Sequence, residues 1–122
     1  MAKLAISSEG PDLDEALDPR FGRAAGFIVV DPQTLEFDYL DNGLSQAMAQ
    51  GAGIQAAEHV ANSGAKTVLT GYVGPKAFMA LQAAGIRVAQ NLADMTVREA
   101  IEMYRNGKVK WARQPNRRGH GR

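Results

Sequence analysis

Apolar and polar residues follow two different periods along this chain, one typical of strands and the other of helices. Apolar residues recur at helical spacing within residues 51–62 and 96–106, and residues 75–84 form a further helical segment. Short runs with the composition of strands make up the remaining ordered segments, and they lie at residues 3–7, 27–30, 35–40, 67–70 and 86–89. The pattern therefore predicts five strands and three helices.

Turn-forming and capping residues support these boundaries. Asp31–Thr34 has Pro at the second position of a type I turn, which predicts a hairpin between residues 27–30 and 35–40. Gly64 follows the first helix as a C-cap, and Pro75 opens the second at a position that proline favours. Thr96 and Glu99 have the spacing of a capping box, so the third helix has the clearest start.

The order of these elements is β-β-β-α-β-α-β-α. Right-handed crossovers then predict an α/β fold with a mixed five-stranded sheet of strand order 3-2-1-4-5 and helices on both faces. A chain of 122 residues suits one such domain, which we assign to residues 1–107. Residues 108–122 are expected to form a flexible tail in which Val109 and Trp111 alone could pack.

Composition excludes several classes of site. The chain has no cysteine, so disulfides, zinc knuckles, thiolate nucleophiles and thiolate-bound iron-sulfur clusters are excluded. Residues 1–104 hold seven Lys or Arg and thirteen Asp or Glu, whereas residues 105–122 hold seven basic residues and no acidic one. The apolar runs are too short for a membrane span or a secretory signal, and we therefore expect a cytoplasmic protein.

The predicted topology brings the candidate chemistry to one edge of the sheet. Four strands end there and the helices begin there, and helix N-termini favour anions. Glycines at this edge would let a bulky ligand approach the backbone, and two arginines would supply positive charge. The candidate binding residues are Ser7, Ser8, Arg20, Phe21, Gly22, Arg23, Gly51, Gly53, Thr70, Gly71, Val73 and Gly74.

Simpler interpretations exist for the same residues. Glycine pairs before helices are usually turns, and their spacing here fits neither a dinucleotide-binding motif nor a P-loop. Arg20 and Arg23 could instead pair with Asp14, Glu15 or Asp18 on the surface. The convergence of both arginines with two helix N-termini is what favours an anion site.

Catalysis and direct metal ligation have little support in the sequence. No Ser-His pair has motif spacing, and the acidic residues of the long loop at residues 8–23 are typical of solvated carboxylates. Met48 could offer a thioether to a soft metal, although methionine more often fills gaps in a core. His59 lies within a helix and His120 in the tail, and neither pattern indicates a ligand. We expect a protein that is not an enzyme.

Four segments of the chain, in the same order, resemble the dinitrogenase iron-molybdenum cofactor biosynthesis family. The similarity covers about residues 3–106, and the segments that carry it are Phe21–Ala24 leading into Phe27–Asp31, Gly51–Ala57, Thr70–Ala77 and Ala84–Val88. The resemblance implies a ribonuclease H-like fold and the binding or carriage of metal-sulfur cofactors. The branch that the chain most resembles implies a molybdenum-copper sulfide cluster that is held noncovalently.

A cluster that brings its own sulfides suits a chain without cysteine. The family's binding residues carry over onto the loop at Phe21–Arg23 and the turns at Gly51–Gly53 and Thr70–Gly74. Gln50 stands where relatives often have His, which favours binding of the cluster without a protein ligand. The resemblance also implies MinD-like P-loop ATPases as partners, which the basic tail could contact. Nucleic-acid binding through the tail is the weaker alternative, because the body is acidic.

Overall fold

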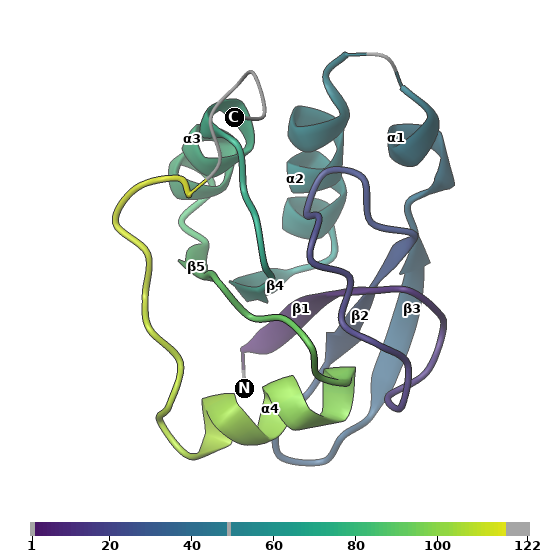
Figure 1. The fold of residues 1–122 in the computed structure, drawn as a ribbon, viewed down its shortest axis with the longest axis vertical. Helices are drawn as coiled ribbons and strands as arrows, with labels where there is room; N and C mark the ends of the chain where they lie inside the picture. The colour runs from purple at the N-terminus through teal and green to yellow at the C-terminus, as the bar shows by residue number, and fades with distance from the viewer. Residues whose placement is uncertain (1, 49, 117–122) are drawn as a thin grey trace.

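A mixed five-stranded sheet forms the centre of the computed structural model, which describes residues 2–48 and 50–116 (Figure 1). The strand order is β3-β2-β1-β4-β5, and the antiparallel pairs are β1 with β2 and β2 with β3, whereas β4 pairs in parallel with β1 and β5. The predicted order is therefore confirmed. The strands are β1 (Lys3–Ser8), β2 (Gly26–Val30), β3 (Phe37–Asp41), β4 (Ala65–Leu69) and β5 (Arg87–Ala89).

Helices cover both faces of the sheet, as predicted. Helices α2 (Ala52–Asn62) and α3 (Pro75–Ala83) lie side by side on one face, and α4 (Val97–Arg105) lies on the other (Figure 1). The capping box at the start of α4 is present, with the Thr96 side chain and the Glu99 side chain each accepting from the other residue's backbone amide. Among the described residues, no helix is both long enough and apolar enough to cross a membrane.

One short helix was not predicted. Helix α1 (Gly43–Ala47) lies between β3 and α2. The described residues therefore form this short helix in addition to the three predicted helices. Its first backbone bond runs from Gln46 N to Asn42 O at 2.9 Å, and no side chain caps its start. Five residues are too few to show an apolar period, which explains why the sequence pattern did not reveal it.

Alternate residues of β1 face the two halves of the core. Ala5 packs in the cluster beneath α2 and α3, whereas Leu4 and Ile6 pack in the cluster beneath α4. Both clusters are buried, and β2 is buried along its whole length. A strand that is covered on both faces has a nearly continuous apolar sequence, as Phe27–Val30 does.

The hairpin between β2 and β3 is longer than predicted. Leu35 has a positive φ of 66° and donates its backbone amide to Asp31 O at 2.8 Å, so β3 begins at Phe37. The Asp31 carboxylate accepts from the backbone amides of Gln33 and Thr34, and these hydrogen bonds lower the pKa of that carboxyl. The capped turn thus extends two residues beyond the predicted one.

The first half of the long loop after β1 packs against the start of α4. Leu13 and Leu17 are buried in the cluster beneath that helix. Leu17 N donates to Met95 O at 2.9 Å, and Val97 N donates to Glu15 O at 2.9 Å. The second half of the loop is therefore anchored before it crosses the edge of the sheet.

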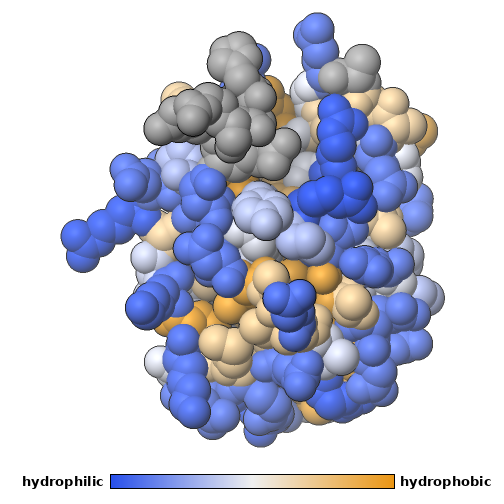
Figure 2. Space-filling model, in the orientation of Figure 1, coloured by the Kyte–Doolittle hydropathy of each residue, from blue (hydrophilic) through white to orange (hydrophobic). Residues whose placement is uncertain are grey.

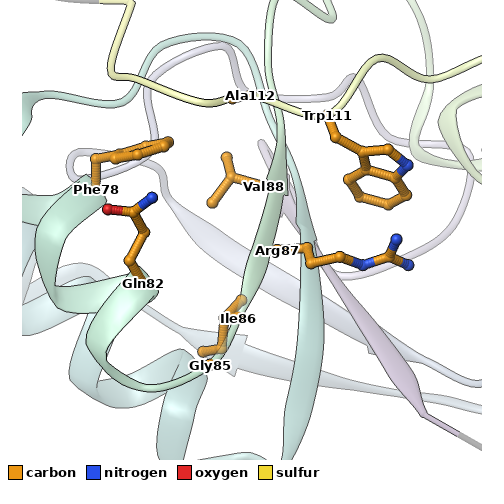
Figure 3. Close-up of a pocket in the computed structure, with 8 residues that line it drawn as sticks. All are labelled: Phe78, Gln82, Gly85, Ile86, Arg87, Val88, Trp111 and Ala112. Atoms are coloured by element: carbon orange, nitrogen blue, oxygen red, sulfur yellow. The ribbon is translucent and has the colours of Figure 1, made fainter.

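Residues 109–116, which we call the C-terminal strap, run from the end of α4 past β5 towards α3 (Figure 1). Ala112 N donates to Val88 O at 2.8 Å, and Trp111 forms a β-bridge with Ala89. The Arg87 guanidinium lies 3.8 Å from the centroid of the Trp111 ring, beside a hollow of about 340 Å³ between β5, α3 and the strap (Figure 3). The sequence assigned this segment to a tail, but a bridge to an edge strand has no local sequence signal. Residues 117–122 of the predicted tail lie outside the described residues.

Close contacts between small residues set the spacing of α2, α3 and the loop before β2. A Cβ atom at Gly53 would lie 2.9 Å from the Ala77 Cβ, and one at Gly22 would lie 2.9 Å from the Gly53 Cα. Gly22, Gly53 and Ala77 therefore stack at the N-terminal ends of the two helices. This stack brings the loop before β2 into contact with the first turn of α2, and α2 into contact with the first turn of α3.

We expect Gly53→Ala to lower the free energy of unfolding by about 1–3 kcal/mol, the usual cost of overpacking. The added methyl has no room beside Ala77, which outweighs the better helix propensity of alanine. Urea denaturation followed by circular dichroism measures the change. Ala77→Gly provides the matched second variant, and it should cost less in the Gly53→Ala background than alone. Strictly additive costs would show that this contact does not limit the spacing.

Candidate functional site

The loop at residues 18–23 is fastened to the turn that follows β4. Tyr72 N donates to Pro19 O at 2.6 Å, and Phe21 N donates to Tyr72 O at 3.1 Å. A Cβ atom at Gly71 would lie 2.6 Å from Pro19 O, so only glycine allows this approach. The loop therefore lies flush against the turn, at the edge where β1 and β4 end.

A cleft of about 810 Å³ opens between the loop and the N-termini of α2 and α3. Its walls come from three segments and one aromatic residue, namely Pro19–Arg23, Gln50–Ile54, Gly74–Ala77 and Tyr72. Figure 2 shows a mostly hydrophilic face with apolar side chains gathered in a central area above α4. Seven of the twelve predicted binding residues line the cleft, and they are Arg20, Phe21, Gly22, Arg23, Gly51, Gly53 and Gly74.

The other five predicted residues do not line the cleft. Ser7 Oγ donates to Asp18 O at 2.6 Å and shares a hydrogen bond of 2.7 Å with Thr70 Oγ1. Ser8 Oγ donates to Gly10 O at 2.6 Å, so all three hydroxyls are buried and engaged within the protein. The remaining two, Gly71 and Val73, are also buried behind the cleft wall. These five residues support the loop rather than facing a ligand.

Three cationic side chains line the cleft, from Arg20, Arg23 and Lys76. Arg23 Nη1 donates to the backbone carbonyls of Gln46 at 3.1 Å and Met48 at 2.6 Å. These contacts hold the loop against the segment that joins α1 to α2. Lys76 lies in the first turn of α3, and none of the described residues that line the cleft is acidic.

The simpler interpretation of Arg20 as an ion-pair partner is partly correct. Its Nε lies 3.1 Å from Asp18 Oδ1 and its Nη2 lies 3.1 Å from Asp18 Oδ2. The hydrogen bonds to Asp18, and then the negative charge of that carboxylate, raise the pKa of Arg20. Asp18 is fully buried and also accepts from the Ala25 backbone amide, whereas Asp14 pairs with Arg98 on the surface. Asp18 therefore fixes the direction of the Arg20 side chain.

Two helices begin at the cleft without a side-chain cap. The first backbone bond across the start of α2 runs from Gln55 N to Gly51 O, and Gly51 has a positive φ of 78°. The corresponding bond of α3 runs from Phe78 N to Gly74 O. Residues 52–54 of α2 and Lys76 and Ala77 of α3 carry the amides that precede these two donors, because Pro75 has no N–H, and first-turn amides of this kind attract anions.

The twelve predicted binding residues do not include three that shape this cleft, namely Ile54, Tyr72 and Lys76. Lys76 directly follows Pro75, and its place in the first helical turn could have been read from that proline. Tyr72 is 44% exposed, and Ile54, also in the wall, is 38% exposed. The exposure of the two apolar side chains depends on how three distant segments meet, so no local pattern indicates it.

The donor set suits an anion that brings its own metal ligands. In the described part of the chain, no group of three or more His, Asp or Glu residues could hold a metal ion, and the chain has no cysteine. His59 does not line the cleft, and its Nδ1 is buried without a hydrogen-bond partner in the described structure. Cationic side chains, helix amides and an apolar wall therefore fit an anionic, partly apolar ligand.

The fold and sequence are similar to those of several known proteins. The structure of the apo form of the orange protein from Desulfovibrio gigas has a TM-score of 0.93 and 56% identity, covering 96% of this chain and 98% of that chain. A Thermotoga protein described as a candidate NifB protein has a TM-score of 0.78 and 32% identity, covering 91% of this chain and 93% of that chain. An uncharacterized protein of Methanocaldococcus jannaschii is 30% identical over 113 residues, which cover 89% of this chain and 90% of that protein.

These likenesses confirm the kinship predicted from the four sequence motifs. The branch that the motifs resemble is the one represented by the orange protein. A family model described as dinitrogenase iron-molybdenum cofactor matches residues 2–107. The chain therefore belongs to the dinitrogenase iron-molybdenum cofactor family.

Proposed function

We propose that the cleft binds an anionic metal-sulfur cluster noncovalently, and that the protein carries this cluster without catalysing a reaction. The observation that supports this proposal is the composition of the cleft wall, in which Arg20, Arg23 and Lys76 lie beside two uncapped helix starts. Family membership and the likeness to the orange protein connect the chain with metal-cluster binding. A molybdenum-copper sulfide cluster is the specific ligand that we propose.

The cluster would supply its own metal-sulfide bonds, so no protein thiolate is required. The protein's part is to offer positive charge and N–H donors to the outer sulfides, in a site partly screened from water. Ile54 and Tyr72 provide apolar wall, and removing water strengthens each electrostatic contact. Binding of this kind depends on the sum of several modest interactions.

The three cations contribute differently. The charge of Arg20 is partly balanced by Asp18, which keeps the guanidinium in one direction. Arg23 donates to the backbone carbonyls of Gln46 and Met48, which holds its guanidinium beside the start of α2. Lys76 adds its charge to the positive end of the α3 dipole. Removing Arg23 or Lys76 would take a positive charge out of the cleft wall and leave the Arg20–Asp18 pair intact.

A second proposed role is docking on MinD-like P-loop ATPases. It is supported by the seven basic residues within 105–122, which contrast with the acidic remainder of the chain. An acidic surface on the partner would attract this segment. Cluster carriage and docking are compatible, because the charges that serve them lie in different parts of the sequence.

We expect anaerobic addition of tetrathiomolybdate and copper to give the protein a visible charge-transfer band that remains through gel filtration. Metal analysis of the same fractions should find molybdenum and copper together with the protein. Retention should fall as NaCl rises from about 0.1 M to about 1 M, because screening shortens from about 10 Å to about 3 Å. A colourless protein fraction at low salt would refute cluster carriage.

Arg23→Ala should weaken cluster retention by about 1–3 kcal/mol, the usual loss for a hydrogen bond to a charged group. Lys76→Ala should act in the same direction, because it removes the charge at the start of α3. Titration of cluster against each variant measures the loss. Lys66→Ala is the matched control, since Lys66 is exposed on β4 and does not line the cleft. If Arg23→Ala and Lys76→Ala have unchanged melting curves and both bind as Lys66→Ala and the wild type do, the cleft is not the site.

A further inference from the structure

The C-terminal strap ends, within the described residues, directly behind the wall of the cleft. Asn116 Oδ1 accepts from Val73 N at 2.9 Å, and Asn116 Nδ2 donates to Gly71 O at 2.7 Å. The two backbone groups belong to the residues on either side of Tyr72. One side-chain amide therefore holds both neighbours of an aromatic residue that lines the cleft.

The Asn116 amide is itself held in place by further hydrogen bonds. Asn116 N donates to Gln90 Oε1 at 3.1 Å, and Gln90 Nε2 donates to Gln114 O at 2.9 Å. Asn116 Nδ2 also donates to Asn91 Oδ1 at 2.8 Å. Gln90 and Asn91 directly follow β5, so the strap is tied to the same edge of the sheet as the turn.

The turn transmits this restraint to the loop that carries the arginines. Tyr72 N donates to Pro19 O, and Phe21 N donates to Tyr72 O. Asn116 is thus connected through the backbone of Gly71–Val73, and then through the two hydrogen bonds of Tyr72, to the residues on both sides of Arg20. If Asn116 lost its side-chain amide, Val73 N would lose the hydrogen bond to Oδ1, while Gly71 O would keep the one from Asn91 N at 2.9 Å, so the turn would loosen on the Val73 side of Tyr72.

The geometry points to Asn116 as a positioning residue of the cleft. We propose that it holds the Tyr72 wall and, through that wall, the Pro19–Phe21 segment in the arrangement that receives the anion. This inference rests on the proposed function for its ligand. It adds a part of the site that the family match does not include, because that match ends at residue 107 and the strap follows it.

Asn116 matters for affinity because noncovalent sites depend on preorganisation. A side chain that touches no ligand contributes when it keeps those that do within a fraction of an ångström of the productive geometry. The strap brings this restraint from a distant part of the sequence. The turn also has hydrogen bonds to Pro19 and Phe21, and Asn91 N donates to Gly71 O at 2.9 Å, whereas Asn116 Oδ1 supplies the hydrogen bond to Val73 N.

The first test uses the protein without any cluster. Asn116→Ala should speed hydrogen exchange of the Tyr72 and Phe21 amides about tenfold, as expected when a hydrogen-bonded turn opens more often. Gln114→Ala is the matched control, because it alters the strap but keeps the backbone carbonyl of Gln114 that accepts from Gln90 Nε2, and none of the described Asn116 hydrogen bonds involves Gln114. Exchange at Tyr72 and Phe21 that is unchanged in Asn116→Ala would overturn the inference, whatever the cluster does.

The second test uses tetrathiomolybdate and copper. Asn116→Ala should retain cluster about tenfold less well and shift the shape of its visible circular dichroism, because the Tyr72 wall moves relative to the anion. Loss of stability alone would lower the amplitude and leave the shape unchanged, and that result would overturn the positioning role. If the wild type takes up no cluster, the proposed function fails, while the exchange measurement still decides whether Asn116 holds the turn.

A truncated chain that ends at Asn116 separates the effect of the Asn116 side-chain contacts from that of the basic residues that follow it. The truncation removes Arg117, Arg118 and Arg122 but leaves every described Asn116 contact in place. Its Tyr72 and Phe21 amides should exchange as in the full chain, and its cluster should give the same band shape. Faster exchange equal to that of Asn116→Ala would contradict the inference that the Asn116 amide is sufficient to hold the turn, because the truncated chain keeps that amide.

Discussion

The pairing of Tyr72 with Pro19 and Phe21 is the contact on which the rest of the cleft depends. It joins a loop that enters β2 to a turn that leaves β4, two segments about fifty residues apart in the sequence. The pairing requires the loop backbone to lie directly on Gly71, where a side chain would meet Pro19 O. The junction fixes the Pro19–Arg23 wall, and the contacts of Gly22 with Gly53 and of Gly53 with Ala77 then set the two helix starts against that wall.

Glycine has two different functions around the junction. Gly22 and Gly53 allow backbones and helices to approach, so their lack of a side chain is used within the protein. Gly51 supplies a positive φ at the start of α2, whereas Gly74 leaves open space at the start of α3. The prediction that glycines would admit a bulky ligand therefore applies best to Gly51 and Gly74, because packing already fills the space beside the others.

Much of the fold was predictable because its signals are local. Strand order follows from the apolar runs and from crossover handedness. The capping-box spacing of Thr96 and Glu99 is a local signal that marks the start of α4. The candidate site was predictable only as an edge of the sheet. Tertiary contacts decide that Ser7 and Thr70 face each other inside the protein rather than a ligand. They also decide that Asp18 is the partner of Arg20. The strap likewise has no period or motif, since its pairing with β5 is set by the edge strand that it covers.

A site without covalent anchors obtains its affinity from geometry as much as from charge. Two arginines and a lysine on flexible side chains would pair with any anion, and screening by salt would weaken them alike. Here one guanidinium is directed by the buried Asp18 carboxylate and another contacts two carbonyls, so their donors are already oriented before a ligand arrives. The entropy cost of ordering these side chains is therefore part of the free energy of folding and does not reduce the free energy of binding. For the proposed cluster, selectivity over chloride would come from its size, because a larger, multiply charged anion reaches several of these fixed donors at once, whereas a small ion reaches few.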